Sequence, residues 1–203
     1  MKKLPPFNLR VKVHGALDAK SFESVGQIIK NNLDEILLKI SNGKKLENFE
    51  KVLEFGCGCG RVLLHIDQKI KSEFFGTDID TKAISWCKKN IDFMNFRTNE
   101  KLPPLDFPEN FFDIIYCISV FTHLDEKEQI KWLEELKRIL KPKGFLLLSL
   151  HGFENLKNEK HIERAKNLGI IKNGFVFCKI KSPIKRIILG NSTTKLAYHT
   201  KHY

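Results

Sequence analysis

Residues 52–63, VLEFGCGCGRVL, contain the pattern that decides the fold. The apolar run at 51–55 is typical of a short buried strand, and three glycines at a spacing of two follow it directly. Glycine removes Cβ atoms where the backbone has to bend sharply and approach a ligand closely. Ligands of open parallel sheets bind at the carboxyl ends of the strands. The stretch therefore predicts a sheet strand followed by a ligand-binding turn.

Other known turn types fit these residues less well. A phosphate loop would need a Gly-Lys-Ser/Thr ending, which is absent, and a metal site at Cys57 and Cys59 would need further Cys or His ligands at matching spacing. We therefore predict no metal. A dinucleotide turn expects G-x-G-x-x-G/A, but the third glycine comes one residue early, at Gly60, and Arg61 fills the position of a small residue. A nicotinamide-dependent oxidoreductase is thereby disfavoured but stays an alternative.

Two acidic residues near this turn suggest what it binds. Glu54 lies in an otherwise apolar strand, where it is costly to bury unless it faces a cation or a donor; the alternative is a solvated acid at the strand end. Asp78 follows the apolar run 73–77, at 18 residues after Gly60, where a carboxylate can accept hydrogen bonds from both hydroxyls of a ribose. Ile79 could then pack on an adenine face, and Asp80 could cap the next helix.

Strand and helix patterns alternate outward from this turn. Apolar spacing predicts a helix from Ser21, stopped at Gly43, and Asp125 to Glu128 has the spacing of a capping box that opens a helix ended by Pro142 and Gly144. Further helices are expected at 61–68 and at 81–90, the latter with Thr81 as N-cap, and strands at 51–55, 73–77, 91–97, 111–117 and 145–150. Such alternation predicts an α/β, Rossmann-like, doubly wound and mostly parallel sheet.

Four segments together resemble the class I S-adenosylmethionine-dependent methyltransferases. They are the 52–61 stretch VLEFGCGCGR, 76–80 GTDID, 112–116 FDIIY and 136–145 LKRILKPKGF, in the family's order and spacing over about residues 48–152. The strings GCGCGRVL, ISVFTHL and LSLHG are similar to a bacterial methyltransferase-domain subgroup associated with glycan-modifying enzymes. The resemblance implies S-adenosylmethionine as the cofactor.

The resemblance also implies roles for individual residues. The turn would hold the methionine part of the cofactor, Glu54 its amino group, Asp78 the ribose and Ile79 the adenine face. Asn99-Glu100 stands where the family has an acid that contacts the adenine amino group, and we choose Glu100; Ser119 would line the methyl-donor side. The cofactor-binding residues predicted in this way are Glu54, Gly56, Cys57, Gly58, Gly60, Asp78, Ile79, Glu100 and Ser119.

The acceptor and the catalytic base follow from residues near the later strands. Methyl transfer needs no protein nucleophile, but an oxygen acceptor benefits from a base, and His123 and His151 both follow expected strands. Alternatively, His123 packs on or caps the next helix. No Asn/Asp-Pro-Pro-Tyr/Phe motif follows the 111–117 strand, which disfavours exocyclic base amines as acceptors. We expect O-methylation of a small-molecule or sugar-type acceptor, with an RNA methyltransferase as a less favoured alternative.

Composition limits the partners of the chain. Its net charge is +11 over 203 residues, but residues 1–150 carry 24 basic against 21 acidic side chains and residues 151–203 carry 11 against 3. The excess lies away from the glycine turn, so nucleic acid is disfavoured as a partner. No apolar run reaches the ~20 residues that span a bilayer, no signal peptide is recognisable, and five cysteines fit reduced thiols, so we expect a cytoplasmic protein.

Three regions are expected. Residues 1–47 form an N-terminal helical cap, 48–152 the S-adenosylmethionine-binding core and 153–203 a basic C-terminal extension. The tail shows a strand-like segment at 174–180 and a loop-like one at 183–194, but no final strand pair such as the family's sixth and seventh strands. A shortened C-terminal part would expose the edge of the fifth strand, which a homo-oligomer or a partner would cover. It would also suit a non-catalytic cofactor-binding or interaction protein.

Overall fold

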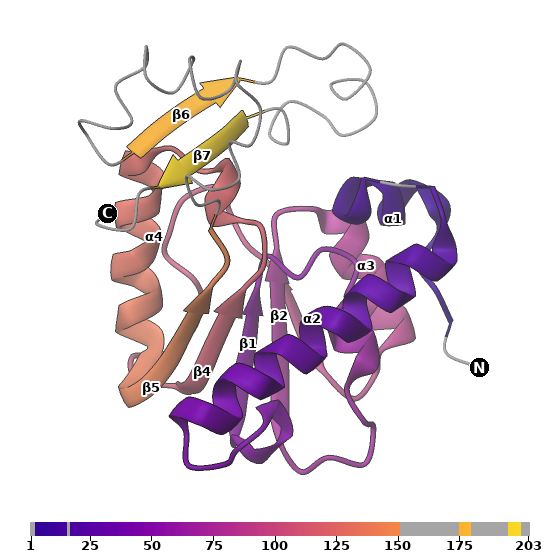
Figure 1. Ribbon diagram of the computed structural model, residues 1–203, viewed down its shortest axis with the longest axis horizontal. Helices are drawn as coiled ribbons and strands as arrows, with labels where there is room; N and C mark the ends of the chain where they lie inside the picture. Colours follow the sequence, from indigo (N-terminus) through magenta and orange to yellow (C-terminus); the bar gives the residue numbers. More distant parts are fainter. Residues whose placement is uncertain (1–2, 16, 151–174, 180–194, 200–203) are drawn as a thin grey trace. The chain divides into compact units, whose positions relative to one another are not determined.

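The computed structural model describes residues 3–15, 17–150, 175–179 and 195–199 (Figure 1). The chain divides into two compact units, Met1–Cys117 with Glu134–Leu147, and Ile118–Leu133 with Leu148–Tyr203. The first unit holds the glycine turn and nearly all of a five-stranded sheet. The second holds a strand pair of its own.

The sheet has the strand order β3-β2-β1-β4-β5. Its strands are β1 (Lys51–Phe55), β2 (Glu73–Asp78), β3 (Asn95–Thr98), β4 (Phe112–Cys117) and β5 (Leu140–Leu148). The central strand β1 pairs in parallel with β2 on one side and with β4 on the other, and β2 pairs in parallel with β3. The predicted α/β, Rossmann-like parallel sheet is confirmed. The strand order reverses between β1 and β4, so the glycine turn lies at the switch point where open sheets bind ligands.

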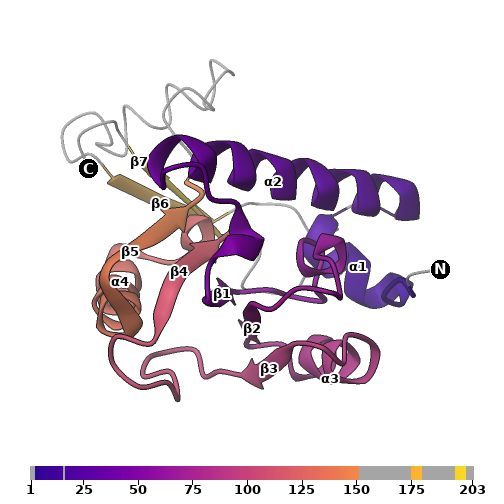
Figure 2. The same ribbon diagram turned by 90° about the horizontal axis from the view of Figure 1, so that it is seen from below.

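Helices occupy most of the predicted positions. They are α1 (Phe7–His14), α2 (Ala19–Ile40), α3 (Thr81–Asn90) and α4 (Glu126–Ile139), with 3-10 turns η1 (Leu46–Asn48), η2 (Leu63–His65) and η3 (Phe121–His123). Helix α2 runs across one face of the sheet (Figure 2) and buries Phe22, Leu33 and Leu37. It begins before Ser21 because the Asp18 side chain accepts hydrogen bonds from the first-turn backbone.

Helix capping explains two further helix starts. The N-cap of α3 is Asp80, the predicted alternative to Thr81, because its carboxylate accepts from the N–H groups of Lys82 and Ala83. The predicted capping box of α4 is confirmed: the Glu128 N–H donates to Asp125 at 2.9 Å, and the Asp125 N–H donates to the Glu128 carboxylate at 3.1 Å.

The helix predicted at 61–68 is wrong. Only the single 3-10 turn η2 forms, and the chain is already extended at Ile66. Helix α2 packs directly on this segment, since a Cβ at Gly26 would lie 2.3 Å from the Arg61 carbonyl oxygen and 2.8 Å from His65 Nε2. An apolar pattern of eight residues supports little helix by itself, because isolated helices shorter than about 12–15 residues are marginal in water.

The end of α4 also differs from the prediction. Pro142 and Gly144 lie inside β5 and do not end the helix, which stops at Ile139. The last helical carbonyls accept hydrogen bonds from the chain that leads into β4, at 3.0 Å from the Asn110 N–H to Arg138 and 2.8 Å from the Phe111 N–H to Ile139. A Cβ at Gly144 would lie 2.9 Å from the Asp113 carbonyl oxygen, so glycine permits β5 to approach there.

The tail contains a strand pair that the sequence analysis did not predict. The strand-like segment at 174–180 is confirmed as β6 (Phe175–Lys179), and it pairs antiparallel with β7 (Lys195–His199). This pair does not extend the five-stranded sheet, so the expectation that the sheet lacks the family's sixth and seventh strands is not contradicted. Among the described strands, β6 and β7 form a separate two-stranded sheet and β5 lies at an edge of the five-stranded one. The loop predicted at 183–194 lies outside the described residues.

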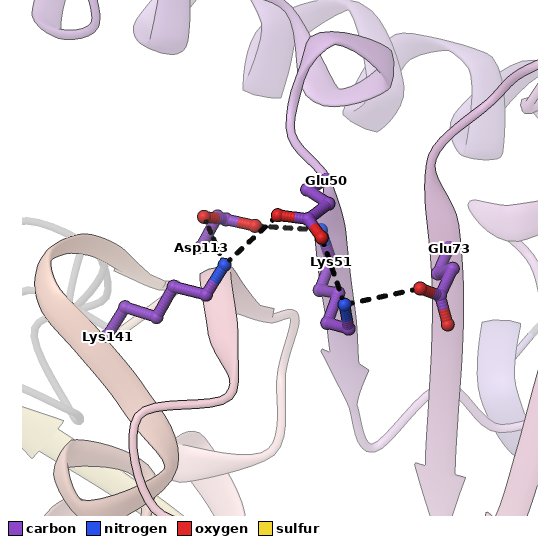
Figure 3. Close-up of polar contacts among 5 residues, drawn as sticks. All are labelled: Glu50, Lys51, Glu73, Asp113 and Lys141. Atoms are coloured by element: carbon purple, nitrogen blue, oxygen red, sulfur yellow. Dashed lines mark hydrogen bonds and ion pairs between the residues drawn. The ribbon is translucent and has the colours of Figure 1, made fainter.

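An ion network joins the amino ends of neighbouring strands, opposite the glycine turn (Figure 3). The Lys141 ammonium lies 2.9 Å from Asp113 and 3.4 Å from Glu50, and the Lys51 ammonium lies 3.1 Å from Glu50 and 3.2 Å from Glu73. The Lys51 N–H also donates to Asp113 at 2.8 Å. These contacts tie the starts of β1, β2, β4 and β5 together.

Candidate functional site

The glycine turn is held in a left-handed backbone conformation. The φ angles of Gly56, Gly58 and Gly60 are 77°, 54° and 78°, a region that favours glycine at each position. The N–H groups of Gly56 and Cys57 both donate to the Thr77 carbonyl at 2.8 and 2.9 Å. The turn is therefore anchored on the end of β2, the strand that carries Asp78.

Two of the glycines also make room for neighbouring side chains. A Cβ at Gly58 would lie 2.5 Å from Cγ2 of Val13 in α1, and one at Gly60 would lie 3.0 Å from Cδ1 of Ile91. The sequence analysis assigned these glycines to close approach of a ligand. The described contacts give Gly58 a second reason, because α1 packs on the turn.

Asp78 lies at the centre of the turn's hydrogen bonds. Its carboxylate accepts from the Gly58 N–H at 2.7 Å and from the Asp80 N–H at 2.8 Å. Burial raises the pKa of Asp78, and these hydrogen bonds oppose the rise without cancelling it. Asp80 instead caps α3 and pairs with Lys12 at 2.7 Å. The two acids thus have separate tasks: Asp78 faces the turn, and Asp80 holds α3 and α1.

Glu54 is a buried acid. Its residue is 3% exposed, so it is not the solvated strand-end acid that the alternative interpretation described. The Tyr116 hydroxyl donates to its carboxyl group at 3.1 Å, from the position on β4 that pairs in register with Glu54. Burial raises the pKa of Glu54 to about 8; Tyr116 and Arg61 lower it, and Asp78 raises it. This carboxyl group is therefore mostly protonated at neutral pH. A cationic ligand group beside it would lower its pKa and favour the charged form.

Arg61 connects the turn to the N-terminal helices. Its Nη1 lies 3.4 Å from the Val13 carbonyl oxygen and 3.4 Å from His14 Nδ1. Its Nε is buried and has no hydrogen-bond partner in the described part of the chain. Burial lowers the pKa of Arg61. The large side chain thus occupies the place where a dinucleotide turn needs a small residue, and packs there against α1.

The thiols near the turn are buried. Burial is the main cause that raises the pKa of Cys57 and Cys87, and it raises that of Cys59 to about 12. Without a metal they are therefore neutral thiols at physiological pH. Among the residues that the structure describes, no group of three or more His, Cys, Asp or Glu side chains is placed to hold a metal ion.

The loop after β3 contains Asn99, which the sequence analysis considered before choosing Glu100. The Asn99 N–H donates to the Asp78 carbonyl at 3.1 Å, which places this loop beside the turn. Asn99 Nδ2 donates to the Glu100 carbonyl, whereas Asn99 Oδ1 is buried and has no hydrogen-bond partner among the described residues. The predicted Glu100 side chain is exposed. Ile79 is 54% exposed, which leaves its side chain accessible to a flat ligand ring.

The remaining predicted residues are not part of the described first unit. Ser119 and His123 belong to the second unit, and His151 lies outside the described residues. Within the second unit, Ser119 has a φ of 61° and its N–H donates to Ser149 Oγ at 2.6 Å. His123 ends the turn η3, and its N–H donates to the Val120 carbonyl at 2.8 Å. The structure thus brings together the predicted residues from Glu54 to Glu100, and their relation to either histidine stays a prediction.

Fold and site together define an α/β protein with a glycine turn, a buried acid and a partly buried acid at the switch point of a parallel sheet. A family described as "Methyltransferase domain" matches residues 52–144. The chain therefore carries a class I S-adenosylmethionine-dependent methyltransferase domain. The resemblance of the sequence to this class is confirmed, and S-adenosylmethionine is the cofactor of the family.

Individual relatives agree on the class and differ in their acceptors. The chain is 29% identical over 142 residues to phosphoethanolamine N-methyltransferase of Plasmodium falciparum, covering 68% of this chain and 51% of that protein. It is 29% identical over 150 residues to malonyl-[acyl-carrier protein] O-methyltransferase of Calditerrivibrio nitroreducens, covering 73% and 56%. The chain thus spans about half the length of these relatives.

A solved structure supports the fold. The chain resembles a SAM-dependent methyltransferase of Methanosarcina mazei with a TM-score of 0.60 and 21% identity, covering 81% of this chain and 78% of that one.

Among the described residues, no helix is long and apolar enough to cross a membrane.

Proposed function

We propose that this protein transfers a methyl group from S-adenosylmethionine to a small-molecule or sugar-type acceptor. The observation that supports this most directly is the pair of acids beside the glycine turn, Glu54, which is buried, and Asp78, which is partly buried. Burial raises the pKa of both carboxyl groups, so a cation bound near them would relieve an unfavourable arrangement. S-adenosylmethionine carries two cationic groups, an ammonium and a sulfonium.

The same acids argue against a nicotinamide dinucleotide. Its diphosphate is anionic and needs N–H groups or cations at the glycine turn. Here the Gly58 N–H already donates to Asp78, and those of Gly56 and Cys57 donate to Thr77. A diphosphate would compete with these acceptors and face two acids. The site is therefore better suited to a cationic cofactor.

Each residue of the site has a proposed task. The carboxylate of Glu54 accepts from the ammonium of the cofactor, Asp78 accepts from the ribose hydroxyls, and Ile79 packs on the adenine. We place Asn99 beside Glu100 as a candidate for the adenine amino group, because its buried Oδ1 lacks a donor. The cofactor supplies an activated methyl group. Holding donor and acceptor in line can lower the barrier by roughly 7–11 kcal/mol at best.

The acceptor assignment rests on the sequence. The segment after β4 lacks the proline-containing motif for exocyclic base amines, and the strings at 56–63, 118–124 and 148–152 are similar to a subgroup associated with glycan-modifying enzymes. We therefore favour an oxygen acceptor, with His123 or His151 as its base. The printed activities of the relatives include both nitrogen and oxygen acceptors, and so do not favour either atom.

Calorimetric titration tests the cofactor. S-adenosylmethionine and S-adenosylhomocysteine should bind and NAD should not; the reverse would refute the proposal. Asp78→Ala should weaken binding of both sulfur ligands by about 5- to 150-fold, the loss of roughly 1–3 kcal/mol of hydrogen bonding. Asp80→Asn is the matched control, because Asn still caps a helix. It should change affinity by less than about twofold, since it removes only a partly exposed ion pair with Lys12.

A turnover assay tests the reaction. Labelled methyl transfer is measured against sugars, nucleotide-sugars and small phosphorylated metabolites. Transfer to one of these classes is expected. Tight binding of the cofactor with no transfer to any acceptor would instead favour the alternative, a non-catalytic cofactor-binding protein.

A further inference from the structure

The inference concerns Tyr116, a residue to which the sequence analysis gave no role. It lies on β4, and its side chain is fully buried at 0% exposure. Parallel pairing of β1 with β4 puts it directly beside Glu54, and its hydroxyl donates to the Glu54 carboxyl group at 3.1 Å. A buried tyrosine hydroxyl needs a partner, and here the partner is the only acid in β1.

We propose that Tyr116 positions the Glu54 carboxyl group for the ammonium of the cofactor, and that Glu54 gives up a proton when this ammonium binds. The inference rests on the proposed function, because it takes the ammonium of S-adenosylmethionine or its product as the partner of Glu54. Tyr116 is a positioning residue: it acts on the ligand only through Glu54.

The proton balance follows from the groups around Glu54. In the free protein the carboxyl group is mostly protonated at neutral pH, because burial raises its pKa to about 8. A neutral carboxyl group and an ammonium would form a carboxylate–ammonium pair and release one proton to the buffer. Tyr116 keeps its own proton, because burial raises its pKa well above the usual value, and it donates to Glu54 in both states.

Other ionisable groups also face Glu54, and they set the control conditions. Arg61 favours the charged carboxylate, whereas Asp78 disfavours it. The thiols of Cys57 and Cys87 also interact with it, and burial raises the pKa of both. None of these groups is in hydrogen-bond contact with Tyr116 among the contacts of the described residues. A change at Tyr116 therefore reaches the ligand through Glu54.

The experiment is calorimetric titration with S-adenosylhomocysteine, whose only cation is the ammonium. Titrations at pH 7 and pH 8 in phosphate, HEPES and Tris, buffers of different ionisation enthalpy, give the number of protons released. With a pKa of about 8 for Glu54, the wild type should release about 0.9 proton at pH 7 and about 0.5 at pH 8. Glu54→Gln cannot ionise and should release none.

Tyr116→Phe removes only the hydroxyl group. Without this donor the carboxylate is less favourable, so the pKa of Glu54 rises further and the release at pH 8 should increase from about 0.5 toward one proton. Affinity should fall by about tenfold, the usual effect of losing a hydrogen bond to a charged group. The control is Ile115→Val, which loses buried volume on the same strand but faces the other side of the sheet and should leave the proton number unchanged.

The outcomes separate the two claims. If Tyr116→Phe binds with wild-type affinity and releases the wild-type number of protons, the positioning role is wrong and the proposed function stands. If wild-type protein binds neither sulfur ligand, the proposed function itself fails. Should Tyr116→Phe not fold, Glu54→Gln decides: proton release equal to that of the wild type would overturn the inference.

Discussion

Val13 of α1 packs directly on Gly58 of the glycine turn: a Cβ at position 58 would lie 2.5 Å from Val13 Cγ2. The contact joins two parts of the chain that are 45 residues apart in sequence. Two further contacts join α1 to this region: Lys12 forms an ion pair with Asp80, and Arg61 donates a hydrogen bond to the carbonyl of Val13. The N-terminal helix is therefore part of the turn's support.

Gly58→Ala should destabilise the protein for two reasons. Its φ of 54° strains any residue with a side chain, and the new methyl group overlaps Val13. Overpacking and backbone strain each cost about 1–3 kcal/mol, so we expect a loss of roughly 2–4 kcal/mol in urea unfolding. Gly43→Ala is the matched control, with a φ of 80° and no atom within 4 Å of its Cβ.

The Gly43→Ala control should lower the free energy of unfolding by only about 1 kcal/mol, from backbone strain. Gly58→Ala combined with Val13→Ala should recover the difference between the two single glycine variants. Equal losses for Gly58→Ala and Gly43→Ala would show that Val13 does not restrict the turn.

Glu54→Gln should stabilise the free protein in a pH-dependent way. The pKa of Glu54 is raised to about 8 from a usual value of 4.5, so the folded state favours the protonated form. Below pH 4.5 the Glu54 carboxyl group is protonated in both the folded and the unfolded state, so its ionisation does not change the free energy of unfolding. Between pH 4.5 and 8 the Glu54 carboxyl group ionises in the unfolded chain but stays protonated in the folded protein. Ionisation therefore stabilises the unfolded state, and the free energy of unfolding falls by on the order of 3–5 kcal/mol in total.

Urea unfolding at pH 4.5, 6 and 8 measures this effect. The variant should match the wild type at pH 4.5 and exceed it by at least ~2 kcal/mol at pH 8. The exposed acid variant Glu100→Gln should stay within about 0.5 kcal/mol of the wild type throughout. A Glu54→Gln difference that does not change with pH would contradict the buried, protonated state.

Local patterns account for the parts of the fold that the sequence predicted. The strand at 51–55, the helix at 81–90 and the capping box at Asp125 depend on neighbouring residues, and all three are found. Helix α1 lacks an apolar period, so no pattern indicated it. The helix expected at 61–68 is replaced by the turn η2, on which α2 packs at Gly26. Local patterns alone indicated neither α1 nor this turn.

The site was predictable to the same extent. Glu54 and Asp78 stood out as acids at the ends of apolar strands. Tyr116 contributes only because β1 and β4 pair in register, across 62 residues of sequence. The single polar hydroxyl in the apolar run 112–117 was the available signal. The unpartnered oxygen of Asn99 appears only in three dimensions.

Asn99, more than Glu100, should govern recognition of the adenine. Its buried Oδ1 lacks a donor, and an adenine amino group would provide one. We expect Asn99→Ala to weaken S-adenosylhomocysteine binding by about 5- to 30-fold, and Glu100→Gln by less than about twofold. The inosine analogue, which lacks the amino group, should bind both variants and the wild type alike. A larger effect of Glu100→Gln would restore the original assignment.

Asp113 should stabilise the fold from the end of the sheet that faces away from the turn. Burial opposes ionisation of Asp113, but hydrogen bonds from the Lys141 ammonium and the Lys51 backbone outweigh it and lower its pKa. A lowered pKa means that the stabilisation is present above pH 3.8, the usual value, and is lost as pH falls through the folded-state pKa.

Asp113→Asn removes the charge and keeps an oxygen for the Lys51 N–H. It should cost about 1 kcal/mol in urea unfolding at pH 7, less in 1 M NaCl, and almost nothing at the acid end of the titration. Asp106→Asn is the matched control, because the Asp106 side chain is 98% exposed and its pair with Arg97 should contribute little. Equal losses for the two variants at pH 7 would mean that the network in Figure 3 adds no stability beyond that of an exposed ion pair.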